Sequence, residues 1–90
     1  MKITYDPVKR DKTLLVRNLD FARAGEVFAR HHFTWADQRR DYGEQRFVTF
    51  GKLDNRMIVM VWTRREDTLR IISLRKANER EQIKYGSRVG

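Results

Sequence analysis

The segment from residue 47 to residue 75 constrains the fold of this chain most, because strand-like runs alternate there with short polar turns. The middle run is almost continuously apolar, which is typical of a strand buried in the centre of a sheet. The strands are expected at Phe47–Phe50, Met57–Thr63 and Leu69–Arg75, with turns at Asp54-Asn55 and Arg64–Thr68. Strands joined by turns this short pair with opposite directions, so the sequence predicts an antiparallel core sheet.

The N-terminal residues carry the signals of a short strand followed by a helix. Lys2–Tyr5 alternates as a strand would. Asp6 and Pro7 mark a helix start, because Asp caps free backbone N–H groups and Pro suits the first helical position. The helix is expected to run to about Arg17 and to stop at Asn18 in the left-handed conformation. Its expected buried residues are Val8, Leu14 and Leu15.

A second helix is expected after a cap at Asp20, because apolar residues recur there at helical spacing. These residues are Phe21, Ala24, Val27 and Phe28. A further strand is expected to begin at residues 33–35. The charged segment Asp37–Glu44 that follows is expected to be a loop that turns at Gly43.

The C-terminal residues predict a short helix. Asn78 with Glu81 three residues later forms a capping box, and the helix is expected to run through Tyr85 and end at Gly86. The whole order predicts an α+β fold with two layers. Two N-terminal helices would pack on one face of a three- to four-stranded antiparallel sheet, leaving the other face partly open to solvent. A chain of 90 residues with no linker is expected to form a single domain over residues 1–90.

The charge balance favours a polyanionic partner. Twenty Lys and Arg residues against twelve Asp and Glu give a net charge of +8, which suits nucleic acid, an acidic protein, or both. The chain has no cysteine, and its two histidines, His31 and His32, are adjacent and cannot face the same way on a helix or strand. We therefore expect no disulfide, no metal site and no cofactor. Without a run of about 20 apolar residues or a signal peptide, a cytoplasmic protein that does not enter membranes is expected.

The basic strand residues are candidates for RNA chemistry. Strict alternation would put Ile71, Ser73 and Arg75 on one face of the last strand, and Arg70, Ile72 and Leu74 on the other. Alternation also puts Arg64 on the same face as Trp62 in the central strand. If Arg64 and Arg75 share the open face, a phosphate can sit between their guanidinium groups. Fixed cations of this kind stabilise the charge that develops when an RNA 2′-hydroxyl attacks the adjacent phosphorus. The alternative is that each arginine is a solvated strand end.

The terminal helix adds Tyr85 and Glu81, which are four residues apart and share a helix face. Tyr85 could stack on a base or transfer a proton. Alternatively, its ring packs on the sheet with the hydroxyl in water. Trp35 and Trp62 are expected to be core or interface residues.

Several segments together resemble the BrnT family of type II toxin–antitoxin toxins. The opening Tyr5-Asp6-Pro7 with Lys9 is similar to the family's aromatic-Asp-Pro-x-Lys, and residues 21–28 are similar to its Phe-x-x-Ala-x-x-Val-Phe helix. Residues 37–46 match the block Asp-x-Arg-x-Asp-Tyr-Gly-Glu-x-Arg. Residues 62–65 resemble Tyr-Thr-x-Arg, in which Arg65 fits the Arg position better than Arg64. Residues 70–77 are close to Arg-Ile-Ile-Ser-Ala-Arg-Lys-Ala.

One departure from the family pattern is clear. The family's Asn-x-x-Lys-His-Gly at the end of the first helix is replaced here by Thr13, Val16, Arg17 and Asn18 at the matching positions. If the Lys-His pair serves catalysis in the family, this chain lacks it.

The resemblance implies a RelE-like fold, a ribonuclease that arrests translation, and neutralisation by a BrnA-type antitoxin. The antitoxin would carry the DNA-binding domain, so operator DNA would be bound only through it, and the complex would hold two toxins. We expect a metal-independent endoribonuclease in which Glu81 or Glu79 orients a basic side chain. The expected catalytic residues are Arg64, Arg75, Tyr85 and Glu81, and the expected RNA-binding residues are Arg65, Arg70, Lys76 and Arg40. The alternatives are a non-enzymatic nucleic-acid-binding module and a protein-interaction domain with an acidic partner.

Overall fold

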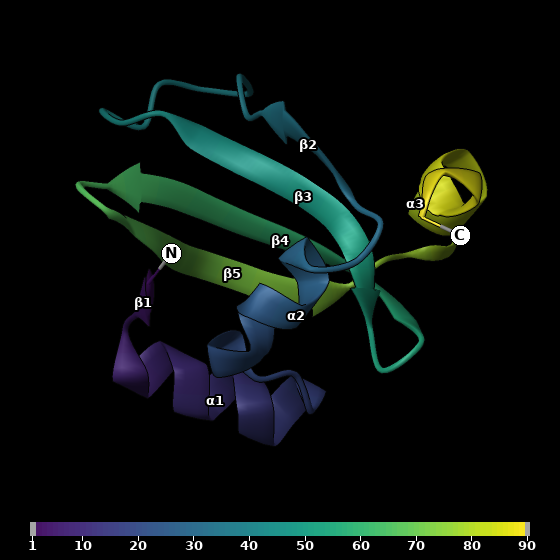
Figure 1. The fold of residues 1–90 in the computed structure, drawn as a ribbon, viewed down its shortest axis with the longest axis horizontal. Helices are drawn as coiled ribbons and strands as arrows, with labels where there is room; N and C mark the ends of the chain where they lie inside the picture. Colours follow the sequence, from purple (N-terminus) through teal and green to yellow (C-terminus); the bar gives the residue numbers. More distant parts are fainter. Residues whose placement is uncertain (1, 90) are drawn as a thin grey trace.

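The computed structural model describes residues 2–89 and has the expected α+β composition (Figure 1). Strands and helices alternate only at the start of the chain, and the middle of the chain is a run of strands. The elements in order are β1 (Lys2–Tyr5), α1 (Pro7–Arg17), the 3-10 turn η1 (Phe21–Arg23), α2 (Ala24–Phe28), β2 (Phe33–Ala36), β3 (Arg46–Leu53), β4 (Arg56–Arg65), β5 (Thr68–Lys76), α3 (Glu79–Tyr85) and the 3-10 turn η2 (Gly86–Arg88).

The strands form one five-stranded sheet in the order β1-β5-β4-β3-β2. The apolar run predicted to be a central strand is β4, which lies in the middle, so this prediction is confirmed. The prediction of a purely antiparallel sheet with three or four strands is wrong, because β1 pairs in parallel with β5 and makes the sheet mixed. This pairing joins residues more than sixty positions apart, for example Lys2 with Thr68, and no local sequence signal reports it.

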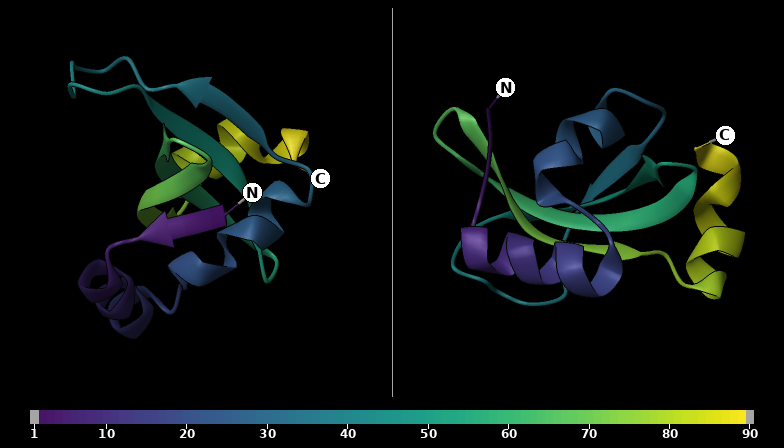
Figure 2. Two further views of the ribbon diagram at one scale, coloured as in Figure 1. Left: turned by 60° about the vertical axis from the view of Figure 1, so that its left-hand side comes forward. Right: turned by 90° about the horizontal axis from the view of Figure 1, so that it is seen from below.

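α1 lies along the edge of the sheet at β1 and β5 rather than on a face, so the prediction that both N-terminal helices cover one face is wrong for α1 (Figures 1 and 2). η1 and α2 do cover one face of the sheet. We call this the helix face, and the opposite side the open face. The core on the helix face joins Phe21 and Val27 of the helical segment to Ile58, Met60 and other strand residues. On the open face, α3 packs at one end of the sheet only, where Val48, Phe50 and Val59 meet Ala77 and Val89. The rest of the open face is therefore free of helices.

The capping signals in the sequence are confirmed. The Asp6 carboxylate accepts a hydrogen bond from the backbone N–H of Val8 at 3.0 Å, and Asn18 ends α1 with φ 57°. Asn78 and Glu81 form the predicted capping box of α3. Gly86 follows the last residue of α3, but with a helical φ of −57° that continues the chain into a 3-10 turn.

The second polar turn is shorter than predicted. Arg64 and Arg65 belong to β4 and Thr68 begins β5, so the reversal is made by Glu66 and Asp67 alone. Glu66 adopts φ 54°, which a two-residue hairpin turn requires.

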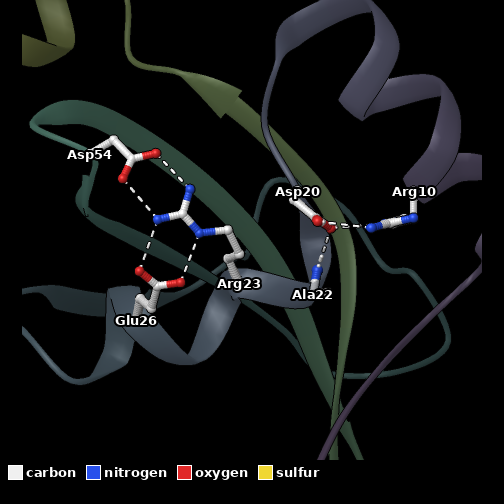
Figure 3. A network of polar contacts seen from close by, with 6 residues as sticks. All are labelled: Arg10, Asp20, Ala22, Arg23, Glu26 and Asp54. Atoms are coloured by element: carbon white, nitrogen blue, oxygen red, sulfur yellow. Dashed lines mark hydrogen bonds and ion pairs between the residues drawn. The ribbon is translucent and has the colours of Figure 1, made fainter.

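The prediction of which α1 residues are buried is wrong for two of three. Val8 and Leu15 are 77% and 87% exposed, and Leu14 is half-buried. The helix instead turns Arg10 inward, where its guanidinium makes two hydrogen bonds of 2.8 Å to Asp20 (Figure 3). Asp20 also caps the next segment by accepting from the backbone of Ala22 at 2.9 Å. This polar anchor, rather than the apolar residues, fixes the face that α1 presents to the protein.

A second polar anchor holds α2 against the β3–β4 turn. The guanidinium of Arg23 bonds both oxygens of Glu26, one helical turn away, and both oxygens of Asp54 in the hairpin (Figure 3). All three side chains lie near the surface, so this network orients the helix more than it stabilises the fold.

Candidate active site on the open face of the sheet

A β-bulge in β5 decides which basic side chains reach the open face. Val61 pairs with Ser73, but the next residue of β4, Trp62, pairs with Ile71, so Ile72 is an extra residue without a partner in β4. A bulge puts two residues opposite one and interrupts the alternation of side chains.

The bulge overturns the predicted division of β5. Ile71 and Leu74 both lie in the core of the helix face, although strict alternation separates them. Ser73 and Arg75 come to the open face with Arg70, because their β4 partners Val61, Val59 and Thr63 all belong to that face. The expectation that Ile71, Ser73 and Arg75 share a face is therefore wrong for Ile71.

The open face carries a groove of about 580 Å³ beside α3. Its floor is apolar and formed by Val48 of β3 and by Val59 and Val61 of β4. Its walls are mostly polar or aromatic and come from β2, the loop after it, the end of β5 and α3. The wall residues are Trp35, Ala36, Asp37, Gln38, Arg39, Ser73, Arg75 and Glu81. An apolar floor with a few converging polar groups is the usual form of a ligand site.

Arg75 is held in this groove by Glu81. Nη1 and Nη2 of Arg75 each donate to a different carboxylate oxygen of Glu81, both at 2.8 Å. The hydrogen bonds from Arg75, opposed by partial burial, hold the pKa of Glu81 below its ordinary value, and those to Glu81 raise the pKa of Arg75. Both groups are therefore charged at neutral pH. The predicted orienting role fits Glu81, whereas Glu79 is exposed on the first turn of α3.

The second cation of the groove, Arg39, was not among the predicted site residues. It forms a forked pair with Asp37 through Nε at 2.8 Å and Nη2 at 2.7 Å. Asp37 also accepts from the Tyr42 hydroxyl at 3.1 Å, and these contacts, chiefly those with Arg39, hold its pKa well below the usual range. The Asp-x-Arg spacing in the sequence was the signal that could have identified this pair.

The rest of the charged loop is also ordered by its own residues. The ring of Tyr42 lies under two guanidinium groups, those of Arg40 at 4.9 Å and Arg46 at 4.3 Å from the ring centre. Gly43, predicted as the turning residue, adopts φ 73°. The block from residue 37 to residue 46 therefore folds into a local network on β2 and β3, with Arg40 exposed at its outside.

Tyr85 packs its ring on the sheet, which was one of the two alternatives predicted for this residue. Its ring centre lies 5.1 Å from Phe33, 5.4 Å from Trp35 and 5.5 Å from Phe50. Trp35 is 36% exposed and forms part of the groove wall, so it offers an aromatic surface there. Trp62 is buried in the core of the helix face, which confirms the prediction for that residue.

Arg64 does not join Arg75. It shares the helix face with Trp62, as predicted, but Arg75 points to the open face, so no phosphate can sit between the two guanidinium groups. Arg64 instead lines a larger cavity of about 1080 Å³ with aromatic walls that include Phe28, Phe47 and Trp62. That cavity has one arginine and no lysine, and we therefore place the candidate active site in the smaller groove with its two arginines.

The predicted RNA-binding residues lie in different places. Arg65 and Arg70 are on the open face, toward the end of the sheet opposite α3, and Arg65 contacts Glu44 at 3.3 Å. Arg70 is five positions before Arg75 in β5, which corresponds to roughly 16 Å along a strand. Lys76 pairs with Ile58 and is exposed on the helix-face side of β5, so it does not share the groove with Arg75.

The positions that depart from the family's Lys-His-Gly segment have structural contacts here. Arg17 donates to the carbonyl oxygen of Leu74 at 3.0 Å, at the edge of β5 that β1 leaves unpaired. The carbonyl oxygens of Arg17 and Asn18 accept from Arg56 at 3.2 Å each. Arg17 therefore ties the end of α1 to the sheet. It is not among the residues that line the open-face groove.

Two further observations concern metal and membrane. Among residues 2–89, no three His, Asp or Glu side chains lie close enough together to hold a metal ion. Within the same residues, no helix has both the length and the apolar character needed to cross a membrane.

With this geometry in place, comparison with known proteins identifies the family. Residues 5–81 match the family model described as the ribonuclease toxin BrnT of type II toxin–antitoxin systems. The chain thus belongs to the BrnT family of ribonuclease toxins, and a toxin of a type II system has an antitoxin as its partner. No curated protein matches the sequence significantly.

Proposed function

We propose that this chain is an endoribonuclease that cleaves RNA in the open-face groove and acts in the cytoplasm to arrest translation. The observation that carries the proposal is Arg75, whose guanidinium is fixed by Glu81 at the wall of a groove that also holds Arg39. We also propose that residues 1–90 act as one RelE-like toxin domain.

The chemistry requires no metal ion, because RNA supplies its own nucleophile. The 2′-oxygen forms a bond to the adjacent phosphorus while the bond from phosphorus to the 5′-oxygen breaks. A base takes the 2′-OH proton and an acid protonates the leaving 5′-oxygen. Negative charge builds on the non-bridging oxygens, and Arg75, supported by Arg39, stabilises it with a guanidinium that is already in position.

The groove also offers means to hold the bases and flanking phosphates. Trp35 gives the groove wall an aromatic surface on which an unstacked base can lie. Tyr85 does not line the groove but packs against Trp35 at 5.4 Å between ring centres, and its hydroxyl is our candidate for proton transfer. Arg65 and Arg70 would contact phosphates farther along the open face. Arg40 would contact RNA from the charged loop, and Lys76 would do so from the edge of the sheet.

We further propose that a BrnA-type antitoxin neutralises the toxin in a complex with two toxins, and that operator DNA is bound through the antitoxin. The net charge of +8 supports an acidic partner. Opposite charges accelerate association more than they strengthen the complex, so the association rate should fall as salt is added. An association rate that does not change with ionic strength would contradict this charge-driven step.

The test is incubation of the purified protein with total RNA, with and without EDTA. Cleavage in both conditions, and its loss in Arg75→Ala prepared in parallel, supports the proposal and excludes a contaminating nuclease. Cleavage that EDTA abolishes and magnesium restores contradicts the metal-independent mechanism. RNA binding without cleavage would instead support a non-enzymatic binding module.

A further inference from the structure

The outer surface of α1 exposes large aliphatic side chains at positions where a surface helix is usually polar. Val8, Lys12 and Leu15 follow the spacing i, i+4, i+7 and lie on one side of the helix, opposite the buried Thr13. Val8 and Leu15 are 77% and 87% exposed, and Val16 beside them is 70% exposed. Figures 1 and 2 show α1 at the margin of the molecule.

This arrangement reverses the usual pattern of a surface helix. Such a helix normally buries its apolar stripe and exposes its polar residues. Here α1 buries a threonine and an arginine anchor, and leaves three large aliphatic side chains in water. Scattered single apolar residues need no explanation, but three such residues exposed on one short helix are consistent with an interaction surface.

Cations border this apolar group on one side. Lys9, Lys12, Val16 and Arg17 line a groove of about 390 Å³ between α1 and β5, with Ser73 and Leu74 as its other wall. Within residues 2–89, neither lysine nor Arg17 forms an ion pair with a carboxylate, whereas Arg10 is paired with Asp11 and Asp20. The surface therefore combines exposed aliphatic side chains with unneutralised positive charge.

We propose that the outer surface of α1 is the docking site for an acidic amphipathic helix of the antitoxin. A helix with aliphatic residues on one side would cover Val8, Leu15 and Val16, and acidic residues at its margin would face Lys9, Lys12 and Arg17. RNA fits this surface less well, because its phosphates match the cations but leave the aliphatic side chains uncovered. The inference rests on the antitoxin part of the proposed function and is independent of the ribonuclease part.

The position of the surface has a consequence for neutralisation. Ser73 lines both the groove beside α1 and the open-face groove that contains Arg75. The two grooves therefore meet at the edge of β5. An antitoxin helix on α1 lies next to the proposed RNA site without filling it, and the chain that continues from this helix is placed to enter the open face.

The first test is the double variant Val8→Ala/Leu15→Ala, with Ile83→Ala as a matched control. Alanine keeps the helix and removes only the exposed side chains. Ile83 is 78% exposed, but on α3. Titration calorimetry with the antitoxin purified from its co-expressed complex measures the affinity. We expect the double variant to bind roughly 10- to 100-fold more weakly, and the control to bind as the unchanged protein does. Equal affinity in all three proteins, with melting temperatures unchanged, overturns the proposal.

The second test reverses the charge with Lys9→Glu/Lys12→Glu. The antitoxin should bind this variant at least 10-fold more weakly at low salt, with a smaller difference at high salt, because screening removes the repulsion. Unchanged or tighter binding by this variant would overturn the proposal that the docked helix is acidic.

RNA cleavage by the same variants separates the two proposals. The Val8→Ala/Leu15→Ala variant should cleave a single-stranded RNA oligonucleotide at the unchanged rate. Loss of RNA binding with normal antitoxin affinity would assign the surface to RNA and overturn the docking proposal. If the unchanged protein does not cleave RNA at all, the ribonuclease proposal fails, while the antitoxin affinities still decide the docking site.

Discussion

Arg75 and Glu81 are joined by two parallel hydrogen bonds of 2.8 Å across the junction between β5 and α3. One oxygen of Glu81 also accepts from the backbone N–H of Asn78 at 2.9 Å, so a single carboxylate links the end of the strand, the helix cap and the helix. The guanidinium of Arg75 is therefore positioned before any ligand binds. A cation that needs no reorganisation stabilises developing charge better than a flexible one.

Replacing Arg75 by Ala should lower the rate of RNA cleavage about 100-fold or more, the usual effect of losing a donor to transition-state charge. Arg75→Lys should recover only part of the rate, because lysine keeps the charge and loses the forked geometry. Cleavage rates and melting temperatures are measured for both variants. A folded Arg75→Ala protein that still cleaves RNA and arrests growth would remove Arg75 from the mechanism.

Replacing Glu81 by Gln tests a positioning role. Glutamine keeps a carbonyl for the N–H of Asn78 but loses the charge that holds Arg75, so we expect the cleavage rate to fall about 10-fold with little loss of RNA affinity. The pKa of Glu81 is lowered from its ordinary value of 4.5, chiefly by Arg75. Its contribution to stability is therefore full above pH 4.5 and is lost as the pH falls through the lowered pKa.

The pH dependence distinguishes this role from simple packing. The free energy of unfolding of the unchanged protein should fall as the pH drops below 4.5. The Glu81→Gln variant should not show the share of this fall that comes from protonation of Glu81. The free energy of unfolding, measured by denaturant titration from pH 7 down to pH 3, reports both. Identical pH profiles for the two proteins would show that the Arg75–Glu81 pair does not contribute.

The sequence predicted the features whose partners are close in the chain. Asp6 caps an N–H two residues later, Asn18 ends a helix by its own backbone conformation, and Asn78 and Glu81 are three residues apart. Each of these signals is complete within one turn of helix. The central place of β4 followed from the same short-range reasoning about turns and apolar runs.

The features that the sequence did not predict depend on contacts between distant segments. The bulge at Ile72 exists only relative to β4, yet it decides that Arg75 and Ser73 reach the open face while Arg64 stays on the other. The side of α1 that faces the protein is set by the hydrogen bonds between Arg10 and Asp20. These bonds outweigh the apolar pattern of the helix, which predicted a different buried side. The sequence alone therefore could not show which basic residues line the groove and which lie elsewhere on the surface.

Replacing Tyr85 by Phe separates its hydroxyl from its ring. The ring contacts with Phe33, Trp35 and Phe50 should persist, so the melting temperature should change little. If the hydroxyl transfers a proton, the cleavage rate should fall about 100-fold, the lower end of the usual contribution of such a group. An unchanged rate in Tyr85→Phe, with a reduced rate in Trp35→Ala, would leave the aromatic surface a binding role only.

Replacing Asp37 by Asn should destabilise the protein without changing Arg75 or Glu81. The Asp37 side chain is 1% exposed and accepts from Arg39, from the Tyr42 hydroxyl and from a backbone N–H. An amide cannot accept at both positions, so the fork with Arg39 is lost. Because Arg39 itself is 72% exposed, we expect a loss of about 2 kcal/mol, less than for a fully buried pair.

Asp41→Asn provides the matched control for Asp37, because Asp41 is exposed in the same loop and accepts one hydrogen bond, from the N–H of Gly43 at 2.8 Å. A loss of about 2 kcal/mol lowers the melting temperature of a domain this size by roughly 10 °C, and the control should change it far less. The pKa of Asp37 is held well below the usual range, so its contribution should be complete at neutral pH and begin to fall only below its ordinary value of 3.8. Equal melting temperatures for the two variants at pH 7 would show that the Asp37 network does not hold the loop.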